Sequence, residues 1–471
     1  MDSSVITLRP YQKKFIADVR AEFSKGCKRI CGVAPCGAGK TVMTGWMIKE
    51  AVNRGNRSIF FVHRKELIEQ TAQTFSTLQI PFGIIAAGHK PNYNLPVQIA
   101  SVQTLVNRLD NLPQPNFLIC DECHHILAKT YLKIINHWKD SFLLGVTATP
   151  ERLGGVRLGD IFQSMVQAPT VKELIQLGNL TDFTYYAPPS NLNFKKLKLV
   201  HGDYQIDQAA HMMQDSKVVH DVIGNYQKFA KGKSCICYCV NVEHSKITAD
   251  AFNQAGIPAA QCDGETPKDE RAAIVNNFRK GNIKVLCNAE LFGEGFDVPN
   301  MDAVILARPT KSLTLHIQQS MRPMRPDKNN PSKKAVILDC VDRNLGLPDD
   351  PRCWSLDPNK EKEEPQHPPM KICPECQAVI PAGCRVCTNC GYEFEYSNWI
   401  NGDAELSEVL HGLNHFLQLA EQHGYKKGWA VFKAMELATS YDDFLSIAQA
   451  MHYKKGWAWH KWQEFKEIQS T

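Results

Sequence analysis

The stretch APCGAGKT, residues 34–41, constrains the fold more than any other part of the sequence. It follows the apolar run 30–33 and precedes VMTGWMIKEAV, whose composition is typical of a helix. A strand that enters a glycine-containing turn and continues as a helix directs several backbone N–H groups at one point, where phosphate groups can bind. In such a turn, Lys40 would reach the β- and γ-phosphates and Thr41 would hold Mg²⁺. The sequence therefore predicts a phosphate-binding turn.

Apolar runs alternate with helix-like segments on both sides of a polar, proline-containing stretch near residues 187–193. Before it, SIFFVH and VQIASVQTL are typical of strands, and RKELIEQTAQTF is typical of the helix between them. After it come the strand-like runs SCICYCV, KVLCNAE, AVILARP and AVILDCV. This alternation predicts an α/β fold with two parallel sheets, each with helices on both faces.

Composition and charge narrow the class of protein. With 471 residues, 43% of them apolar, the chain is long enough for about three domains. No apolar run approaches a membrane span, and MDSSVITLRP lacks the features of a signal peptide, so we expect a cytoplasmic protein with no membrane partner. The 17 cysteines include Cys235, Cys237 and Cys239, whose alternation predicts small buried side chains on one strand face. The net charge of +5 permits a nucleic-acid partner without requiring one.

The run FLICDECHH would deliver two carboxylates to the carboxyl end of a strand, where an open α/β sheet binds its ligand. Asp121 can hold the Mg²⁺ that bridges the phosphates, and Glu122 can orient and deprotonate the attacking water. The next strand-like run, FLLGVTATPER, ends in a hydroxyl-rich turn that contains Thr147 and Thr149. We expect this turn to couple the nucleotide site to a second surface.

These motifs resemble superfamily 2 helicases and translocases, with a DECH version of the second motif, over roughly residues 5–345. The resemblance implies two RecA-like domains that close on ATP and move along nucleic acid. It implies an adenine contact by Gln12, coupling by Thr147, Ala148 and Thr149, and strand contacts by His63, Arg64 and Gln103. The residues that it implies around ATP in the first domain are Arg9, Gln12, Pro35, Cys36, Gly37, Ala38, Gly39, Lys40 and Thr41.

Two further stretches resemble the fifth and sixth helicase motifs. In GEGFDVP, Gly295 would let backbones approach closely and Asp297 would contact the ribose or the strand. In HIQQSMRPMRP, Gln318 is followed by two arginines three residues apart, which would share a helix face. We predict Arg325 as the arginine finger and Arg322 as its phosphate-positioning neighbour. Met321 stands at the usual glycine position and Pro323 follows, so the division of roles between the arginines stays open.

A proline- and charge-rich stretch, residues 346–370, is typical of a linker or a lightly packed arm. It leads to CPECQAVIPAGCRVCTNCGYEF, within residues 371–396. The pairs Cys373/Cys376 and Cys387/Cys390 have the spacing of a tetrahedral four-thiolate Zn²⁺ site, which would be structural because four thiolates leave no open position. Cys384 also pairs with Cys387. We favour Cys390 because Gly391 permits the tight turn of a zinc knuckle.

The C-terminal region, residues 397–471, repeats the pattern YKKGWAxxKxxE and should be helical. Trp429 and Trp457 occupy the same place in the two copies. Displayed aromatic and lysine side chains suit base stacking and phosphate neutralisation. Two packed helical hairpins, or a surface that docks a protein partner, would show the same pattern, so these interpretations stay open.

The combination of DECHH, EGFDVP, the cysteine module and the YKxGWA repeats resembles the RadD-like DNA-repair ATPases most closely. We therefore predict RecA-like domains over 1–180 and 181–345, the linker 346–370, a zinc-ribbon-like module over 371–396 and a helical region over 397–471. The predicted function is that of an ATP-dependent DNA translocase or helicase in repair or replication-fork processing, with ATP, Mg²⁺ and Zn²⁺. The partners would be single-stranded or branched DNA and single-strand-binding protein, with the chain a monomer. The alternatives are an ATP-gated DNA-binding or annealing factor and an RNA helicase.

Overall fold

The fold is taken from a computed structural model of the 471-residue chain. The structure describes residues 6–150, 158–188, 192, 194–200, 202–289, 301–327, 329–341, 345–356, 370–394, 413, 415–417, 419–421, 427–435, 437–438, 441–451, 453 and 455–469. The chain divides into two compact units, residues 1–394 and 395–471, and each is described by itself.

The N-terminal part of the first unit is built on a seven-stranded sheet in the order β3-β4-β2-β5-β6-β1-β7, in which every neighbouring pair is parallel. Its strands are β1 (Arg29–Val33), β2 (Ser58–Val62), β3 (Phe82–Ile85), β4 (Val97–Ser101), β5 (Phe117–Asp121), β6 (Phe142–Thr147) and β7 (Ser164–Gln167). The α-helices of this part are α1 (Pro10–Ser24), α2 (Lys40–Asn53), α3 (Lys65–Thr77), α4 (Val102–Leu105), α5 (Lys129–His137) and α6 (Val171–Gln176).

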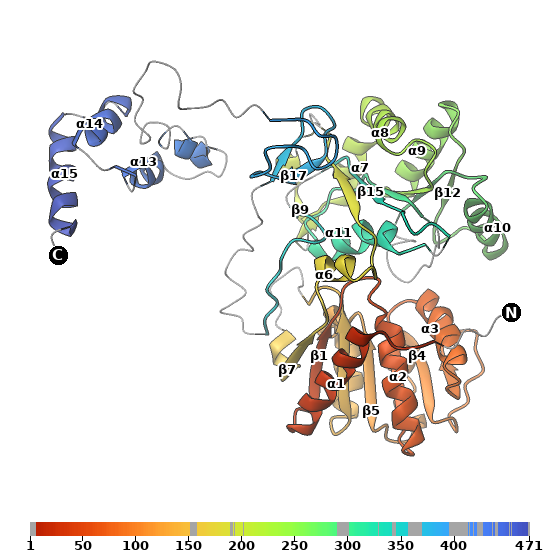
Figure 1. The fold of residues 1–471 in the computed structure, drawn as a ribbon. Helices are drawn as coiled ribbons and strands as arrows, with labels where there is room; N and C mark the ends of the chain where they lie inside the picture. Colours follow the sequence, from red (N-terminus) through yellow and green to blue (C-terminus); the bar gives the residue numbers. More distant parts are fainter. Residues whose placement is uncertain are drawn as a thin grey trace. The chain divides into compact units, whose positions relative to one another are not determined.

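Helices cover both faces of this sheet because successive strand residues point to opposite sides. Phe60 belongs to the apolar cluster that includes residues of α1, α2 and α3, whereas Phe61 belongs to the cluster that includes residues of α4 and α5. Figure 1 shows α1, α2 and α3 on one face of the strands. The predicted parallel sheet with helices on both faces is confirmed here.

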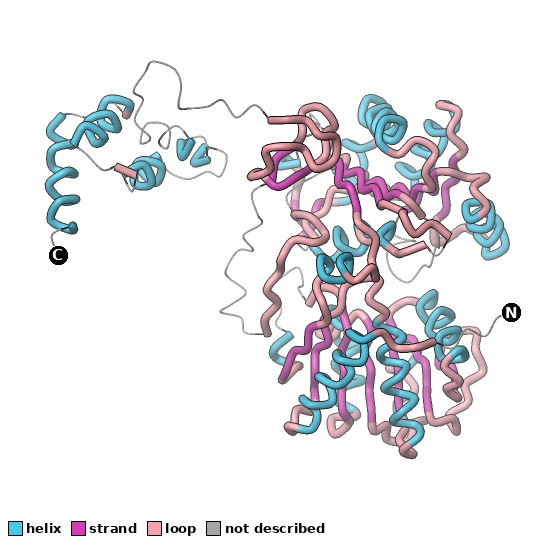
Figure 2. The backbone as a smooth tube through the Cα atoms, viewed as in Figure 1, coloured by secondary structure: helices cyan, strands magenta, loops and turns pink. Residues whose placement is uncertain are grey.

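A second, six-stranded parallel sheet has the order β12-β13-β11-β14-β15-β8. Its strands are β8 (Phe183–Tyr186), β11 (Cys235–Tyr238), β12 (Ala259–Cys262), β13 (Val285–Asn288), β14 (Ala303–Leu306) and β15 (Ala335–Asp339). The α-helices here are α7 (Ile206–Met213), α8 (Ser216–Phe229), α9 (Val242–Gln254), α10 (Lys268–Arg279) and α11 (Leu313–Ser320). Figure 2 shows both sheets as magenta strands among cyan helices. Cys235, Cys237 and Cys239 are at most 1% exposed in one apolar cluster, as predicted.

Residues 346–356, from the stretch 346–370 predicted as a linker or arm, pack against both sheets. Leu347 contacts the apolar cluster on one face of the second sheet. Trp354 and Leu356 contact the cluster that contains α5 on the first sheet. The guanidinium of Arg352 donates to the carbonyl oxygens of Leu347 (2.8 Å) and Pro348 (3.2 Å), which holds this segment folded on itself.

Two smaller parts complete the chain. Strands β16 (Met370–Ile372) and β17 (Val379–Pro381) form an antiparallel pair in the cysteine-rich module. In the second unit, α13 (Lys427–Met435), α14 (Tyr441–Ala450) and α15 (Lys455–Gln469) surround an apolar cluster that includes Phe444 and Ala458. Among the described residues, none of the helices has the length and apolar character needed to span a bilayer.

Candidate nucleotide-binding site

The predicted phosphate turn connects β1 to α2, and two glycines give it its shape. Gly37 and Gly39 have φ angles of +82° and +85°, which glycine adopts without steric cost. A Cβ on Gly39 would lie 2.5 Å from Nε2 of Gln12, and one on Gly37 would lie 2.9 Å from Cδ2 of Leu180. Helix α2 begins directly after Gly39, so its free N–H groups and positive end face the turn. The site therefore has the backbone of an anion-binding loop.

Helix α1 braces this turn from one side. The carbonyl oxygen of Ala38 accepts hydrogen bonds from the Tyr11 hydroxyl (2.8 Å) and from Nε2 of Gln12 (3.0 Å). Oε1 of Gln12 accepts from the backbone N–H of Arg9 at 3.0 Å. Gln12 is only 5% exposed and holds the turn in place here, and its contact with adenine stays a prediction.

The two carboxylates of the DECH motif lie at the carboxyl end of β5. Asp121 ends the strand, and Glu122 follows with φ +47°, a left-handed conformation that is strained for a residue with a side chain. Oε1 of Glu122 lies 3.6 Å from Nζ of Lys40, and both side chains are 12% exposed. Burial opposes the ionisation of both groups. Their mutual attraction outweighs it, so the pKa of Glu122 is lowered and that of Lys40 is raised.

His124, which was not among the predicted site residues, connects Glu122 to the hydroxyl-rich turn. Its Nδ1 lies 3.4 Å from Oε2 of Glu122 and 3.1 Å from Oγ1 of Thr147. Thr147 Oγ1 also donates to the carbonyl oxygen of Thr149 at 3.0 Å. Oγ1 of Thr149 then donates to Oγ1 of Thr314, on α11, at 2.8 Å. A chain of polar contacts thus runs from the carboxylate of Glu122 to α11, a helix that belongs with the second sheet. The DECHH motif itself marks His124, whereas only the tertiary structure identifies Thr314.

The two predicted arginines do not lie on one helix. α11 ends one residue before Met321, and Arg322 begins the short 3₁₀ helix η5 (Arg322–Met324), with Arg325 in extended backbone. Pro323 explains the difference, because it lacks the N–H that a continuing α-helix needs. Both arginines nevertheless line one cavity with the phosphate turn. Met321 is 1% exposed in an apolar cluster, so the residue at the usual glycine position serves as a core residue.

A cavity of about 410 Å³ brings together most of the predicted nucleotide residues from both sheets. Those that line it are Arg9, Cys36, Gly37, Gly39, Lys40, Thr41, Asp121, Glu122, Gln318, Arg322 and Arg325, together with the unpredicted Val42, Leu67, Gln70, Thr74, Asn179, Met321 and Pro326. Of the other predicted residues, Gln12, Pro35 and Ala38 lie outside the lining, and Gly295 and Asp297 are outside the described residues.

Two buried polar atoms show that this cavity suits a polar ligand. Nε2 of Gln318 and Oε2 of Glu122 are buried without a hydrogen-bond partner among the described parts of the chain. An unmet buried donor or acceptor costs free energy that a ligand can recover. With a cationic lysine, three arginines and a helix N-terminus on its walls, the cavity fits a nucleoside triphosphate. Thr41 and Asp121, which also line the cavity, carry oxygen atoms of the kind that Mg²⁺ prefers.

The residues predicted to contact a nucleic-acid strand in the first domain are partly brought together. Nε2 of Gln103 lies 3.3 Å from Nδ1 of His63, which stacks on His125 at 5.2 Å between ring centroids. Arg64 precedes α3 directly. In the second unit, Trp429 and Trp457 are half-buried, whereas Trp459 is 51% exposed. The repeat pattern alone did not distinguish Trp459.

The four predicted zinc ligands form one cluster. The sulfur atoms of Cys373, Cys376, Cys387 and Cys390 all lie within 4.8 Å of one another. Sγ of Cys373 is 3.7 Å from Sγ of Cys390, and Sγ of Cys376 is 3.7 Å from Sγ of Cys387. Tetrahedral Zn–S bonds of about 2.3 Å would separate the sulfurs by about 3.8 Å. The cluster therefore fits zinc, and Cys384 is not part of it.

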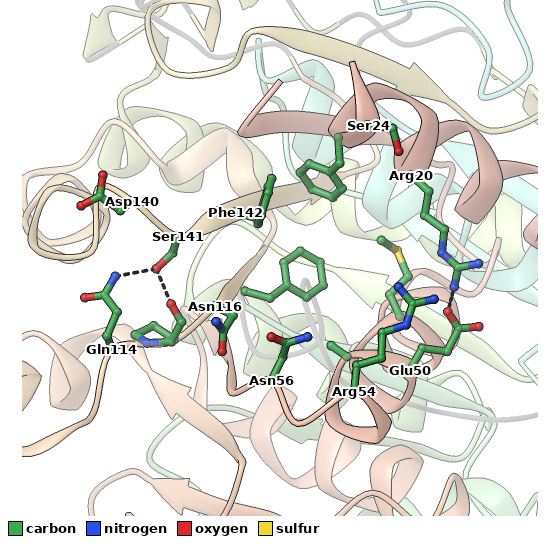
Figure 3. A pocket seen from close by; sticks show the side chains of 15 residues that line it. Arg20, Ser24, Glu50, Arg54, Asn56, Gln114, Asn116, Asp140, Ser141 and Phe142 are labelled. Carbon is green, nitrogen blue, oxygen red and sulfur yellow. Dashed lines mark hydrogen bonds and ion pairs between the residues drawn. The ribbon is translucent and has the colours of Figure 1, made fainter. Parts of the chain in front are cut away.

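A second cavity, of about 530 Å³, lies at the amino ends of the first sheet's strands (Figure 3). Phe117 and Phe142, the first residues of β5 and β6, line it together with Phe23 of α1. Figure 3 also shows Arg20 of α1 paired with Glu50 of α2. Two arginines, Arg20 and Arg54, and two acidic residues, Glu50 and Asp140, line this second cavity. It therefore lacks the excess of positive charge found in the nucleotide cavity.

Two family models match the chain. The model described as Type III restriction enzyme, res subunit, matches residues 5–152, and that of the helicase conserved C-terminal domain matches residues 214–327.

Similar proteins and structures point the same way. A 51.5 kDa protein of a Lactococcus phage (isolate 7-9) is 36% identical, over 85% of this chain and 87% of its own. A Saccharomyces cerevisiae protein named as the ATP-dependent helicase IRC3 is 29% identical over 68% of this chain, which spans 50% of that relative. The solved fragment of an HsdR subunit of a type I restriction enzyme from Vibrio vulnificus YJ016 superimposes with a TM-score of 0.54. The two sequences are 18% identical, and the superposition covers 70% of this chain and 63% of the HsdR fragment. This similarity shows the fold alone. This chain belongs to the superfamily 2 helicases of the DEAD/DEAH type.

Proposed function

We propose that the protein is an ATP-dependent translocase or helicase that acts on DNA. The observation that carries this proposal is the cavity in which the phosphate turn, both DECH carboxylates, Gln318 and two arginines meet. Because residues from both sheets line this cavity, its shape changes when the two sheets move toward or away from each other. This is the arrangement that a nucleotide-driven motor needs.

The turn and its neighbours would bind ATP. Backbone N–H groups near Gly37 and Gly39, with the ammonium of Lys40, offer positive charge to the phosphates. Thr41 and Asp121 would hold Mg²⁺, which neutralises charge on the phosphates during transfer. Arg322 and Arg325 add positive charge from the second domain.

Glu122 is the residue best placed to activate water. Its Oε2 is buried without a hydrogen-bond partner among the described residues and therefore keeps acceptor capacity. Nδ1 of His124 lies 3.4 Å from that oxygen and 3.1 Å from Oγ1 of Thr147, so the carboxylate lies beside the hydroxyl-rich turn. The backbone of Glu122 is left-handed, with φ +47°, and this strained conformation sets the direction in which its side chain leaves the end of β5.

DNA as the partner is the finer part of the proposal. The model that matches residues 5–152 describes a restriction enzyme subunit, an enzyme class that acts on DNA. The proposed nucleic-acid contacts in the first domain are His63, Arg64 and Gln103. They follow the carboxyl ends of β2 and β4, and Glu122 follows the carboxyl end of β5. In the second unit, Trp459 is the better candidate for base stacking than Trp429 or Trp457, because it is the most exposed of the three.

The role of the second unit can be tested with two tryptophan variants. Trp459→Ala should weaken single-stranded DNA binding about 10-fold, since one stacked base contributes about 1–3 kcal/mol. Trp457→Ala, in the half-buried position, should instead lower the thermal stability of this unit. Equal DNA affinity for Trp459→Ala and the wild type would exclude the stacking role.

We also propose Zn²⁺ in the four-cysteine cluster, a role in DNA repair of the RadD-like kind, contact with single-strand-binding protein and a monomeric state. The cluster geometry supports the metal. The repair role, the protein partner and the oligomeric state follow from the resemblance of the sequence to the RadD-like ATPases.

ATP hydrolysis by the purified protein tests the proposal. Rates would be measured without nucleic acid and with single-stranded DNA, duplex DNA, forked DNA and RNA. We expect stimulation by DNA that Lys40→Ala abolishes, while Lys49→Ala, on the same helix but outside the cavity, retains it. Stimulation by RNA alone would replace DNA as the partner. No hydrolysis under any condition would favour a DNA-binding or annealing factor.

A further inference from the structure

The cysteine-rich module is joined to the edge of the second sheet. β8 is the last strand of that sheet, so one side of it is available for pairing. Tyr186 of β8 forms an antiparallel bridge with Ala378, and the backbone N–H of Ala187 donates to the carbonyl oxygen of Gln377 at 3.4 Å. The backbone that follows Cys376 therefore extends the sheet.

A single amide connects the cluster to this strand. Asn389 lies between Cys387 and Cys390, and its Nδ2 is 3.4 Å from Sγ of Cys376 and 3.3 Å from the Tyr186 hydroxyl. Its Oδ1 accepts from Oγ1 of Thr184 at 3.4 Å. One side chain thus contacts a metal-ligand sulfur and two side chains of β8.

Packing reinforces this connection on the side of the sheet. The Tyr186 ring stacks on Phe229 of α8, with 4.4 Å between centroids and planes 21° apart. Tyr186 also contacts the small apolar cluster of the module, in which Cys373, Ala378, Ile380 and Cys387 are buried. So small a cluster cannot hold a module folded without a further constraint, and a bound metal would supply it.

We propose that Asn389 is a positioning residue that couples metal binding at the four cysteines to the order of β8, so that the module is a structural part of the second RecA-like domain. The inference rests on the zinc site proposed above. An N–H group that donates to a ligating thiolate orients the ligand and stabilises its charge. The same amide then holds Tyr186 and Thr184, so release of the metal frees both ends of the contact.

The connection continues from β8 to the segment that contains Arg322 and Arg325. The backbone N–H of Thr181, just before β8, donates to the carbonyl oxygen of Met324 at 2.8 Å. Met324 lies between Arg322 and Arg325, which line the nucleotide cavity. Loss of order in β8 should therefore reach the residues that the second domain contributes to ATP hydrolysis.

The test uses the full chain and hydrogen exchange. Zinc content is measured first by mass spectrometry, and zinc is then removed with a chelator and restored. Removal should raise exchange of the amides of β8 and of Ala187, which follows it, at least 10-fold, and zinc should restore protection. The β12 amides, residues 259–262 at the other edge of the sheet, serve as the internal control.

Variants separate the amide from the metal. Asn389→Ala should raise the rate of zinc release to a chelator about 10- to 100-fold, and Thr388→Ala, on the same exposed loop, should not. Tyr186→Phe keeps the ring on Phe229 and removes only the hydroxyl, so it should show a smaller increase even if Asn389→Ala unfolds the module.

The outcomes are distinct. Protein that contains no zinc and binds none on addition would overturn the metal site itself. Bound zinc whose removal leaves β8 exchange unchanged would overturn the coupling. Zinc release unaffected by both Asn389→Ala and Tyr186→Phe would overturn the role of the amide.

Discussion

The cavities at the two ends of the first sheet hold similar chemical groups in different surroundings. At the carboxyl ends of the strands, Lys40 and Glu122 form a pair whose side chains are each 12% exposed. At the amino ends, Arg20 and Glu50 form a pair whose side chains are 45% and 39% exposed (Figure 3). The second cavity is the larger, about 530 against 410 Å³, so volume does not single out the nucleotide site.

The direction of the chain explains the difference. At the carboxyl ends α2 begins, so its N–H groups and positive end face the cavity. At the amino ends α1 and α2 finish, at Ser24 and Asn53, and present carbonyl oxygens. Only the carboxyl edge also receives arginines from the second sheet. A phosphate therefore suits the cavity at the carboxyl ends of the strands and not the cavity at the amino ends, although both cavities contain a cation and a carboxylate.

The largest effect should come from the arginines. Arg325→Ala should lower the kcat of DNA-stimulated ATP hydrolysis about 10³-fold, because a guanidinium that stabilises the transferring phosphoryl group has an effect of this order. Arg54→Ala, in the amino-end cavity, is the control and should leave the rate unchanged. A greater loss for Arg322→Ala than for Arg325→Ala would exchange the roles of the two cavity arginines.

The two glutamates provide the next comparison. Glu122→Gln should lower kcat about 10²-fold or more, as expected when a general base is removed. Glu50→Gln should leave kcat unchanged, since an exposed ion pair contributes about 0–1 kcal/mol to stability. A kcat for Glu122→Gln that equals the wild-type value, once rates are corrected for the fraction of folded protein, would show that the buried pair acts only in folding.

The Glu122 carboxylate also predicts a pH dependence of the stability. The pKa of Glu122 is lowered in the folded protein because attraction to Lys40 outweighs the cost of burial. Its stabilising contribution is therefore present above the unfolded pKa of about 4.3 and is lost as the pH falls through the lower folded value. Urea unfolding should show the advantage of the wild type over Glu122→Gln shrinking below about pH 4.3. A difference that does not change with pH would contradict the lowered pKa.

A smaller effect on ATP hydrolysis is expected from the hydrogen bond between Thr149, after β6 of the first sheet, and Thr314 of α11. Thr314→Val removes the acceptor for the Thr149 hydroxyl, which lies 2.8 Å away. Because a hydrogen bond of this kind contributes about 1 kcal/mol, DNA-stimulated hydrolysis should fall about 5-fold. The double variant Thr149→Val/Thr314→Val should lose little more than either single one. Additive losses would mean that the hydroxyls act separately.

The smallest effect on activity should come from the phenylalanines of the amino-end cavity. Phe142 is 41% exposed and meets Phe23 edge-to-face, with 5.1 Å between ring centroids. Phe142→Ala should lower the free energy of unfolding by about 1 kcal/mol through this aromatic pair and leave ATP hydrolysis unchanged. A large loss of hydrolysis in the folded variant would show that the cavity at the amino ends also has a function.

Local pattern was enough for much of the fold. The alternation of apolar runs with helix-like segments predicted parallel sheets with both faces covered, and Phe60 and Phe61 lie on opposite faces. The assumption of one helix for Arg322 and Arg325 was wrong, because the spacing was read as α-helical across Pro323. The sequence also contained the reason, since proline cannot continue a helix.

Three groups could be predicted from sequence alone, because each consists of residues close together in the chain: the glycine turn with Lys40, the DECH carboxylates and the paired cysteines. Which distant residues contact these groups depends on the tertiary structure. It places Thr314 against Thr149, Asn389 between Cys376 and β8, and the arginines beside the phosphate turn. These contacts depend on how strands are ordered and how the elements of the two sheets approach each other. No local spacing encodes that order, because it results from packing over the whole chain.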